Sequence, residues 1–234
     1  MKMVGERVKY FRGIAASKGY AIGKVQSVQN MGYGALVQKG CDPQTEYRRI
    51  LKAKDKAIEQ LQQVYKDVFT NLGEEYAVFF QIHIAMLEDT DYLEEISQCL
   101  VNERVNAEYA VWKISCNFYE QLSAIDNEYM RARGGDIIDI SNRLLSCLNP
   151  AYALKRRIYN KETILVANIL TPSEAVRIRR NNILGVITEH GSKSAHSSII
   201  ARMMGVPMVV GVGKAYAELV NTQELIIDGF SGDV

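Results

Sequence analysis

Residues 191–213 contain the side chains best suited to chemistry. Their sequence, GSKSAHSSIIARMMGVPMVVGVG, opens with a loop of small residues that leads to His196. Residues 197–204 have helical character, and the apolar run 208–212 is typical of a buried strand. The first N–H groups of a helix have no partner inside the helix and attract anions. A histidine at such a helix end could lie beside a phosphoryl group and attack it.

Phosphoryl transfer would make His196 the nucleophile. A neutral imidazole offers a lone pair near neutral pH, because its unperturbed pKa is about 6.5. The other ring nitrogen should then donate its N–H to a fixed acceptor. Gly191 permits a close-fitting loop with positive φ, Ser194 offers a hydroxyl donor that could also orient the ring, and Lys193 supplies charge. Arg202 could lie near the phosphate or brace the helix. We assign these four residues to phosphate positioning.

Strands and helices alternate around this loop. Residues 163–167, 185–188 and 224–229 have the composition of strands, and 20–25 is strand-like near the N-terminus. The sequence TPSE at 171–174 is a capping box that should open a helix reaching about residue 180. Alternation of this kind predicts an α/β layer fold over residues 147–234.

Residues 36–146 have a different pattern, with apolar side chains recurring at spacings of three and four. Asp42 followed by Pro43 predicts a helix start, with Asp as the cap and Pro at the first helical position. Successive helices with short joints predict an all-α bundle, which the pattern alone would also allow as a separate domain. The expected helices cover 43–72, 74–87, 91–102, 107–133 and 136–148.

Bulk properties exclude several function classes. The net charge of +1 gives no general attraction to nucleic acid. The four cysteines are far apart, which indicates reduced thiols rather than a metal site. No apolar run approaches the ~20 residues of a membrane span, and the N-terminus lacks a signal-peptide core. We therefore expect a cytoplasmic protein without metal, membrane or nucleic-acid sites in these residues.

The histidine loop resembles the phosphohistidine loop of Enzyme I of the phosphoenolpyruvate:sugar phosphotransferase system. The likeness extends over nearly the whole chain. Pyruvate phosphate dikinase and phosphoenolpyruvate synthase share a similar loop, but other segments favour Enzyme I. The segments that carry the resemblance are GSKSAH at 191–196, IIAR at 199–202, VPMVVG at 206–211, RGIAAS at 12–17, IGK at 22–24, HIAMLED at 83–89, ILVA at 164–167 and LTPSE at 170–174.

The resemblance implies a fold and a reaction. It implies a swivelling phosphohistidine α/β domain over residues 1–35 and 147–234, with a helical bundle inserted at 36–146. Nε2 of His196 would accept phosphate from phosphoenolpyruvate and pass it to a histidine of the phosphocarrier protein HPr, which energises sugar uptake. Phosphoenolpyruvate and Mg²⁺ would bind a C-terminal domain outside these residues, so no cofactor is expected here. That domain and HPr are the two implied partners.

The resemblance also places HPr in a groove on the bundle. Two glutamates could pair with a basic residue beside the HPr histidine and aid orientation. The alternatives are that Phe79 and Tyr129 simply close the bundle core and that His83 is an ordinary packed histidine. By matched position, the groove residues are Glu74, Glu75, Val78, Phe79, His83, Met86, Tyr129 and Arg133.

Four positions depart from the family pattern, and each loses a donor or some freedom of the loop. Ser192 replaces a Gly, Lys193 an Arg and Ala195 a Ser, and Ala175 stands where a Thr commonly reaches the active histidine. These departures leave open a non-catalytic module that binds HPr or regulates it. A second alternative is the swivelling domain of a dikinase or synthase, against which the long helical insertion argues.

Overall fold

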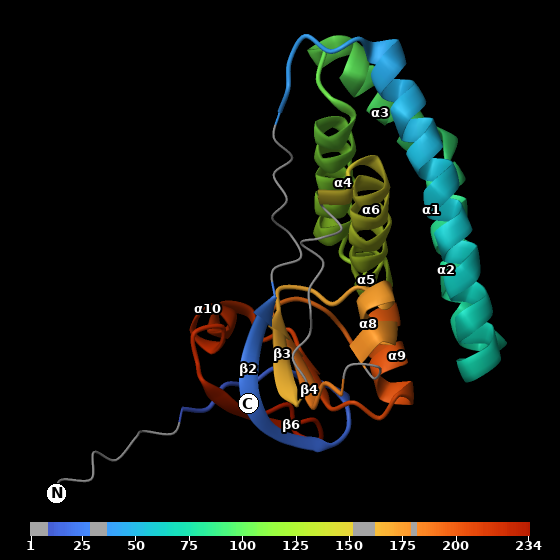
Figure 1. The fold of residues 1–234 in the computed structure, drawn as a ribbon. Helices are drawn as coiled ribbons and strands as arrows, with labels where there is room; N and C mark the ends of the chain where they lie inside the picture. The colour runs from blue at the N-terminus through green and yellow to red at the C-terminus, as the bar shows by residue number, and fades with distance from the viewer. Residues whose placement is uncertain (1–8, 29–36, 152–161, 179–181) are drawn as a thin grey trace, which may run out of the picture.

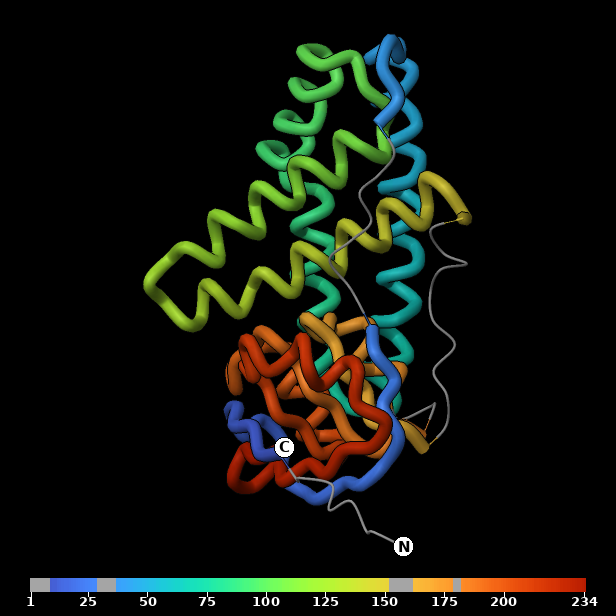
Figure 2. The backbone as a smooth tube through the Cα atoms, turned by 90° about the vertical axis from the view of Figure 1, so that its left-hand side faces the viewer, coloured from blue at the N-terminus to red at the C-terminus, as the bar shows by residue number. Residues whose placement is uncertain are grey.

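The computed structural model describes residues 9–28, 37–151, 162–178 and 182–234. Helices form one end of the molecule and a sheet forms the other (Figure 1). A view turned by 90° shows the blue N-terminal segment running among the orange and red C-terminal ones (Figure 2). Both ends of the chain therefore build the α/β part, and the predicted fold class, an α/β unit with an inserted bundle, is confirmed.

Six strands form the sheet, in the order β1-β5-β4-β3-β2-β6. The four central strands are parallel, and the edge strands β1 and β6 are antiparallel to their neighbours. Strands β3, β4 and β5 are buried along their whole length, as expected where helices cover both faces of a parallel sheet. The strands are β1 (Ile14–Ser17), β2 (Tyr20–Val28), β3 (Thr163–Ala167), β4 (Gly185–Thr188), β5 (Met208–Val210) and β6 (Glu224–Asp228).

The first strands belong to the same sheet as the last ones. Strand β2 pairs with β3, with Lys24 opposite Thr163, and also with β6, with Ile22 opposite Ile226. The prediction that the N-terminal strands join the α/β part is therefore confirmed. Strand β5 ends two residues before the predicted end, because Gly211 has a φ of 69° and leaves the extended conformation.

The helices of the α/β part are short. They are α8 (Pro172–Ile178), α9 (His196–Met203), a 3₁₀ turn η2 (Gly213–Ala215) and α10 (Tyr216–Leu219). The predicted capping box opens α8: the N–H of Glu174 donates to Thr171 Oγ1 over 3.3 Å, and the N–H of Thr171 donates to Glu174 Oε2 over 3.1 Å. The predicted end of this helix, near residue 180, lies outside the described residues.

Within the residues that the structure describes, six helices form the bundle. They are α1 (Pro43–Leu72), α2 (Glu74–Glu88), α3 (Thr90–Glu103), α4 (Ala107–Ala124), α5 (Glu128–Ala132) and α6 (Gly134–Leu148). Helix α1 begins where predicted, because the Asp42 carboxylate accepts the N–H of Thr45 over 2.9 Å. Helices α1 and α2 form a hairpin whose tip reaches down beside α8 and α9 (Figure 1).

The predicted single helix over 107–133 is wrong. Helix α4 ends at Ala124, because Ile125 adopts an extended conformation, and α5 begins after Asn127. The side chain of Asn127 accepts the N–H of Met130 over 3.2 Å and caps the new helix, a role that asparagine prefers to a helix interior.

The junction with α6 and the predicted domain boundaries also differ in detail. Helix α6 begins at Gly134, where an added Cβ would lie 2.9 Å from the ring of Tyr119. The glycine therefore permits close approach rather than breaking the helix. The boundary predicted at 146 falls in the last turn of α6, which continues to Leu148. The boundary predicted at 35 lies outside the described residues.

The bundle and the α/β part meet at the N-terminal half of α6. This half of α6 contacts both α8 and α9, and Phe79 of α2 packs on the apolar core beneath α8 and α9. Within the described residues, no helix combines the length and apolar character that a bilayer crossing requires. The four cysteines are free thiols.

Candidate active site

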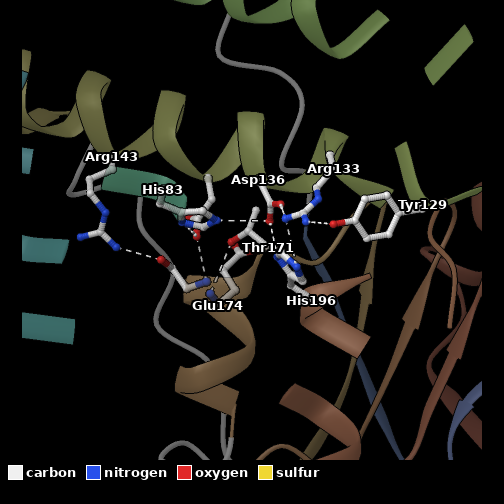
Figure 3. Close-up of polar contacts among 10 residues, drawn as sticks. His83, Tyr129, Arg133, Asp136, Arg143, Thr171, Glu174 and His196 are labelled. Atoms are coloured by element: carbon white, nitrogen blue, oxygen red, sulfur yellow. Dashed lines mark hydrogen bonds and ion pairs between the residues drawn. The ribbon is translucent and has the colours of Figure 1, made fainter. Parts of the chain in front are cut away.

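His196 is the first residue of α9 and lies where the bundle meets the α/β part (Figure 3). Its ring stacks on the ring of Phe79, with centroids 3.9 Å apart and planes 20° apart. Only 8% of the residue is exposed. The sequence predicted His196 at a helix N-terminus, and the fold covers its side chain with an aromatic ring from the bundle.

Asp136 of α6 fixes the ring of His196. His196 Nδ1 lies 3.1 Å from Asp136 Oδ1. Burial alone would raise the pKa of Asp136, but hydrogen bonds from His196 and His83 outweigh it and hold this pKa well below its usual range. The carboxylate is therefore ionised and can only accept, so the proton of His196 is on Nδ1. This is the fixed acceptor that the chemistry requires.

Nε2 of His196 consequently carries the lone pair. It faces Nη1 of Arg133 at 3.2 Å, and the same guanidinium nitrogen lies 3.4 Å from Asp136 Oδ2. Arg133 also donates to the hydroxyl of Tyr129 and lies over its ring, 4.7 Å from the centroid. A cation therefore stands where negative charge would arrive on the nucleophile.

His83 binds the opposite side of the same carboxylate. Its side chain is fully buried, and its Nε2 lies 3.2 Å from Asp136 Oδ1. Its Nδ1 has no hydrogen-bond partner and lies 3.6 Å from Asp139 Oδ2. The expectation that His83 contacts a partner protein does not hold in this structure. Together His83, Asp136 and His196 offer three ligand atoms within 4.8 Å of one another, which could hold a metal ion.

The loop before His196 is held by its own hydroxyls. Gly191 has a φ of 138°, and an added Cβ would lie 3.3 Å from Val210. Ser198 Oγ donates to the carbonyl of Ser192 over 2.7 Å. Ser194 pairs with Ser192 Oγ at 2.9 Å and donates to Glu128 of α5 over 3.3 Å. The hydroxyl of Ser194 is therefore engaged away from the ring, whose orientation Asp136 sets instead.

Arg202 braces the loop. Its Nε donates to the carbonyl of Ala16 over 3.0 Å, and its Nη2 donates to the carbonyl of Lys193 over 2.8 Å. The second of the two roles expected for Arg202 therefore fits the structure. Lys193 is exposed and remains the nearest loop cation.

A cavity of about 970 Å³ adjoins the histidine. His196 and Asp136 line it together with the loop from Thr188 through Ser192 and with Arg131 and Glu128 of α5. The cavity has room for a phosphate-sized anion next to the loop.

Apart from the fully buried His83, the expected partner-binding residues separate into two groups. Glu74, Glu75 and Val78 are exposed in the first turns of α2, and Tyr129 is exposed beside Arg133. Phe79, Met86 and Arg133 are half-buried, and the first and last of these contact His196 itself. The exposed side chains lie around the site, and two of the half-buried ones, Phe79 and Arg133, cover His196.

Sequence reasoning missed Asp136 and Asp139. Both are buried and lie one turn apart in α6. The available signal was two carboxylates at spacing three in the sequence GGDIIDI, whose other residues are apolar or glycine. Since a buried carboxylate needs a partner, such a pair indicates a polar contact across an interface.

Two family models match the chain. Residues 12–133 match the model described as the N-terminal domain of PEP-utilising enzymes, and residues 159–232 match the mobile domain of the same enzymes. Curated relatives include the phosphoenolpyruvate-protein phosphotransferase of Geobacillus stearothermophilus, 35% identical over 97% of this chain. The corresponding protein of Haemophilus influenzae is 38% identical over 95% of the chain. The chain spans only 39% of the length of each of these relatives.

Solved structures with the same fold include an NMR solution structure of an Enzyme I protein. It is 25% identical, with a TM-score of 0.59, and the match covers 96% of this chain and 92% of that one. A structure titled as the N-terminal domain of "Enzyme 1 - Nitrogen" is also 25% identical, with a TM-score of 0.57 and coverage of 95% and 91%.

Proposed function

This chain belongs to the family of PEP-utilising enzymes, and we propose that it is the phosphohistidine-bearing part of a phosphoenolpyruvate-protein phosphotransferase. The observation that carries the proposal is the tautomer of His196. Asp136 holds the proton on Nδ1 and leaves a lone pair on Nε2 that faces a guanidinium. This is the arrangement that a phosphoryl-accepting imidazole needs.

In the proposed reaction, the lone pair of Nε2 attacks phosphorus. The P–N bond forms while the bond from phosphorus to the enol oxygen of phosphoenolpyruvate breaks, and the electron pair leaves on that oxygen. The transfer to HPr repeats the displacement with a histidine nitrogen of HPr as the nucleophile. Nδ1 keeps its proton throughout, because Asp136 accepts it.

Arg133 would exchange its acceptor during this reaction. In the structure it donates to Nε2, the atom that attacks. Once the phosphoryl group occupies that nitrogen, the guanidinium can donate to phosphoryl oxygens instead, where charge-assisted hydrogen bonds are strong. The ring must also gain access to its partners, because Phe79 and Arg133 cover it. We propose that the bundle and the α/β part move apart during transfer.

We propose that HPr docks on the exposed start of α2. Glu74 and Glu75 present negative charge in its first turn, and Val78 presents an apolar side chain one turn further on. Phe79 lies next to Val78 and stacks on the nucleophile, so a partner bound to this face is adjacent to His196. The glutamates would steer a basic partner and raise its association rate more than its affinity.

The proposal assigns the remaining parts of the enzyme to residues outside this chain. Phosphoenolpyruvate and Mg²⁺ would bind a C-terminal domain. The donors around His196 are two imidazoles and one carboxylate, a set that does not suit Mg²⁺, which prefers oxygen ligands. The proposal places the reaction in the cytoplasm, where phosphoenolpyruvate is produced.

The test is phosphoryl exchange with HPr. The chain is mixed with HPr that carries labelled phosphohistidine, and we expect acid-labile label on the chain but no label from phosphoenolpyruvate alone. His196→Ala should abolish the labelling. His190→Ala is the matched control and should retain it, because His190 is largely exposed in the neighbouring loop.

Two outcomes would replace the proposal. Binding of HPr without any label would favour the non-catalytic module. Labelling by a nucleotide-dependent phosphohistidine donor, and not by phospho-HPr, would favour the dikinase alternative.

A further inference from the structure

We propose that His83, Asp136 and His196 form a zinc site, and that zinc bound there prevents His196 from accepting phosphate. The second half of this statement rests on the proposed function, and the first half does not. The three residues come from α2, α6 and α9 and are all buried. Figure 3 shows both rings directed at the carboxylate that lies between them.

The ligand atoms have a suitable spacing. Zinc binds imidazole nitrogen and carboxylate oxygen at about 2.0–2.2 Å, so neighbouring atoms of a tetrahedral site lie about 3.4 Å apart. Asp136 Oδ1 lies 3.2 Å from Nε2 of His83 and 3.1 Å from Nδ1 of His196. Two imidazoles and one carboxylate with an open fourth position is also a donor set that zinc accepts in proteins.

The second observation is the unpartnered nitrogen of His83. Without metal, the proton of His83 is on Nε2, and its buried Nδ1 makes no hydrogen bond. With zinc on Nε2, the proton moves to Nδ1, which lies 3.6 Å from Asp139 Oδ2. A metal-bound histidine that directs its other N–H at a carboxylate is the usual outer arrangement of such sites. Zinc would therefore give the unpartnered nitrogen its acceptor.

The same displacement of a ring proton by zinc would prevent His196 from attacking phosphorus. Zinc on Nδ1 displaces the proton to Nε2, so the ring stays neutral but its attacking nitrogen loses the lone pair. The fourth zinc position would face the cavity that His196 and Asp136 line. The N–H on Nε2 would then face Nη1 of Arg133, which must withdraw toward Tyr129. A ring that holds zinc on Nδ1 therefore cannot accept a phosphoryl group until Nε2 loses its proton.

Binding can be measured on the unphosphorylated chain, without any transfer reaction. The chain and a chromogenic zinc chelator compete for Zn²⁺, and we expect one ion per chain. The chain has three histidines, and His190, which is not one of the proposed ligands, serves as the control. His83→Gln and His196→Gln should weaken binding by about 100-fold or more, and Asp139→Asn by about 10–100-fold. His190→Ala should bind like the wild type, and Arg133→Ala should bind more tightly because a competing cation is gone.

Two further readouts address the wild-type chain, so the test does not depend on the folding of a variant. Long-range ¹H–¹⁵N spectra of the imidazoles should show the proton of His196 moving from Nδ1 to Nε2 as zinc is added. Labelling by phospho-HPr should fall in proportion to zinc occupancy and return with a chelator. Binding that survives His83→Gln, binding lost in His190→Ala, or ring spectra that zinc leaves unchanged would each overturn the site. If the chain binds zinc but phospho-HPr does not label it even in the absence of zinc, the zinc site stands and the proposed function is rejected.

Discussion

Helices α8 and α9 of the α/β part both begin against α6 of the bundle, but their N-termini are capped differently. Each is met by an aspartate of α6. Asp139 accepts the backbone N–H of Ser173 in α8 over 2.9 Å, and Asp136 binds the ring of His196 in α9 over 3.1 Å. Since the aspartates are one turn apart on α6, one face of the bundle serves both ends.

The difference lies in how each end is closed. The N-terminus of α8 is capped by side chains. Thr171 and Glu174 form a reciprocal capping box, and Arg143 donates to Ser173 Oγ over 2.8 Å. The start of α9 has Ala195 at the cap position, with no side-chain hydrogen bond, and it borders a cavity. The first end is a structural joint between the two parts, and the second begins without a side-chain cap.

The largest effect is expected from Asp136→Asn. The amide can donate to Nδ1 of His196 and would favour the proton on Nε2, which removes the attacking lone pair. We expect the rate of labelling by phospho-HPr, measured by rapid quench, to fall about 1,000-fold or more, as when the tautomer is wrong in a serine-protease triad. Asp139→Asn is the matched change at the other helix and should lose far less. A loss of less than about tenfold in Asp136→Asn would contradict the role of Asp136.

The complementary change, Asp139→Ala, should act on stability. It leaves the buried N–H of Ser173 without its acceptor, and the free energy of unfolding in urea should fall by about 1–3 kcal/mol. Asp126→Ala serves as the control, because Asp126 is fully exposed and its pair with Arg131 should contribute little. An unchanged stability in Asp139→Ala would show that α8 does not need the bundle.

The pH dependence of stability tests the environment of Asp136. The pKa of Asp136 is held below its usual range, so its contribution is fully present above the unfolded value of about 3.9 and is lost as pH falls through the lower folded value. We expect the free energy of unfolding to decline more steeply below about pH 4 in the wild type than in Asp136→Asn. Parallel curves for the two proteins would mean that the carboxylate is not stabilised by the two histidines.

The smallest effect is expected from adding a side-chain cap at the N-terminus of α9. Ala195→Ser gives α9 a side-chain cap and should raise the free energy of unfolding by about 0.5–1 kcal/mol. Thr171→Ala, the opposite change at α8, should lower it by a similar amount. If Ala195→Ser stabilises nothing, the N–H groups at the start of α9 already have partners.

Local patterns were enough for much of the fold. Asp42 with Pro43 marked the start of α1, and Thr171 with Glu174 marked the start of α8, because a cap and its acceptor lie within one turn. The loop before His196 marked the start of α9 in the same way, because the small residues and the first helical residue are neighbours in sequence. The pattern failed at residues 125–127, where apolar spacing continued across a turn that the cap of Asn127 creates.

The sequence by itself determined that a histidine begins a short helix after a loop of small residues. Only the tertiary structure decided which of its nitrogens is free, because Asp136 and Arg133 reach the ring across 60 and 63 residues of chain. It also decided that His83 lies against the same carboxylate instead of facing a partner. Periodicity reports which side of a helix is buried. The identity of the group on the other side depends on how separate helices pack, and a buried polar atom takes its role from that contact.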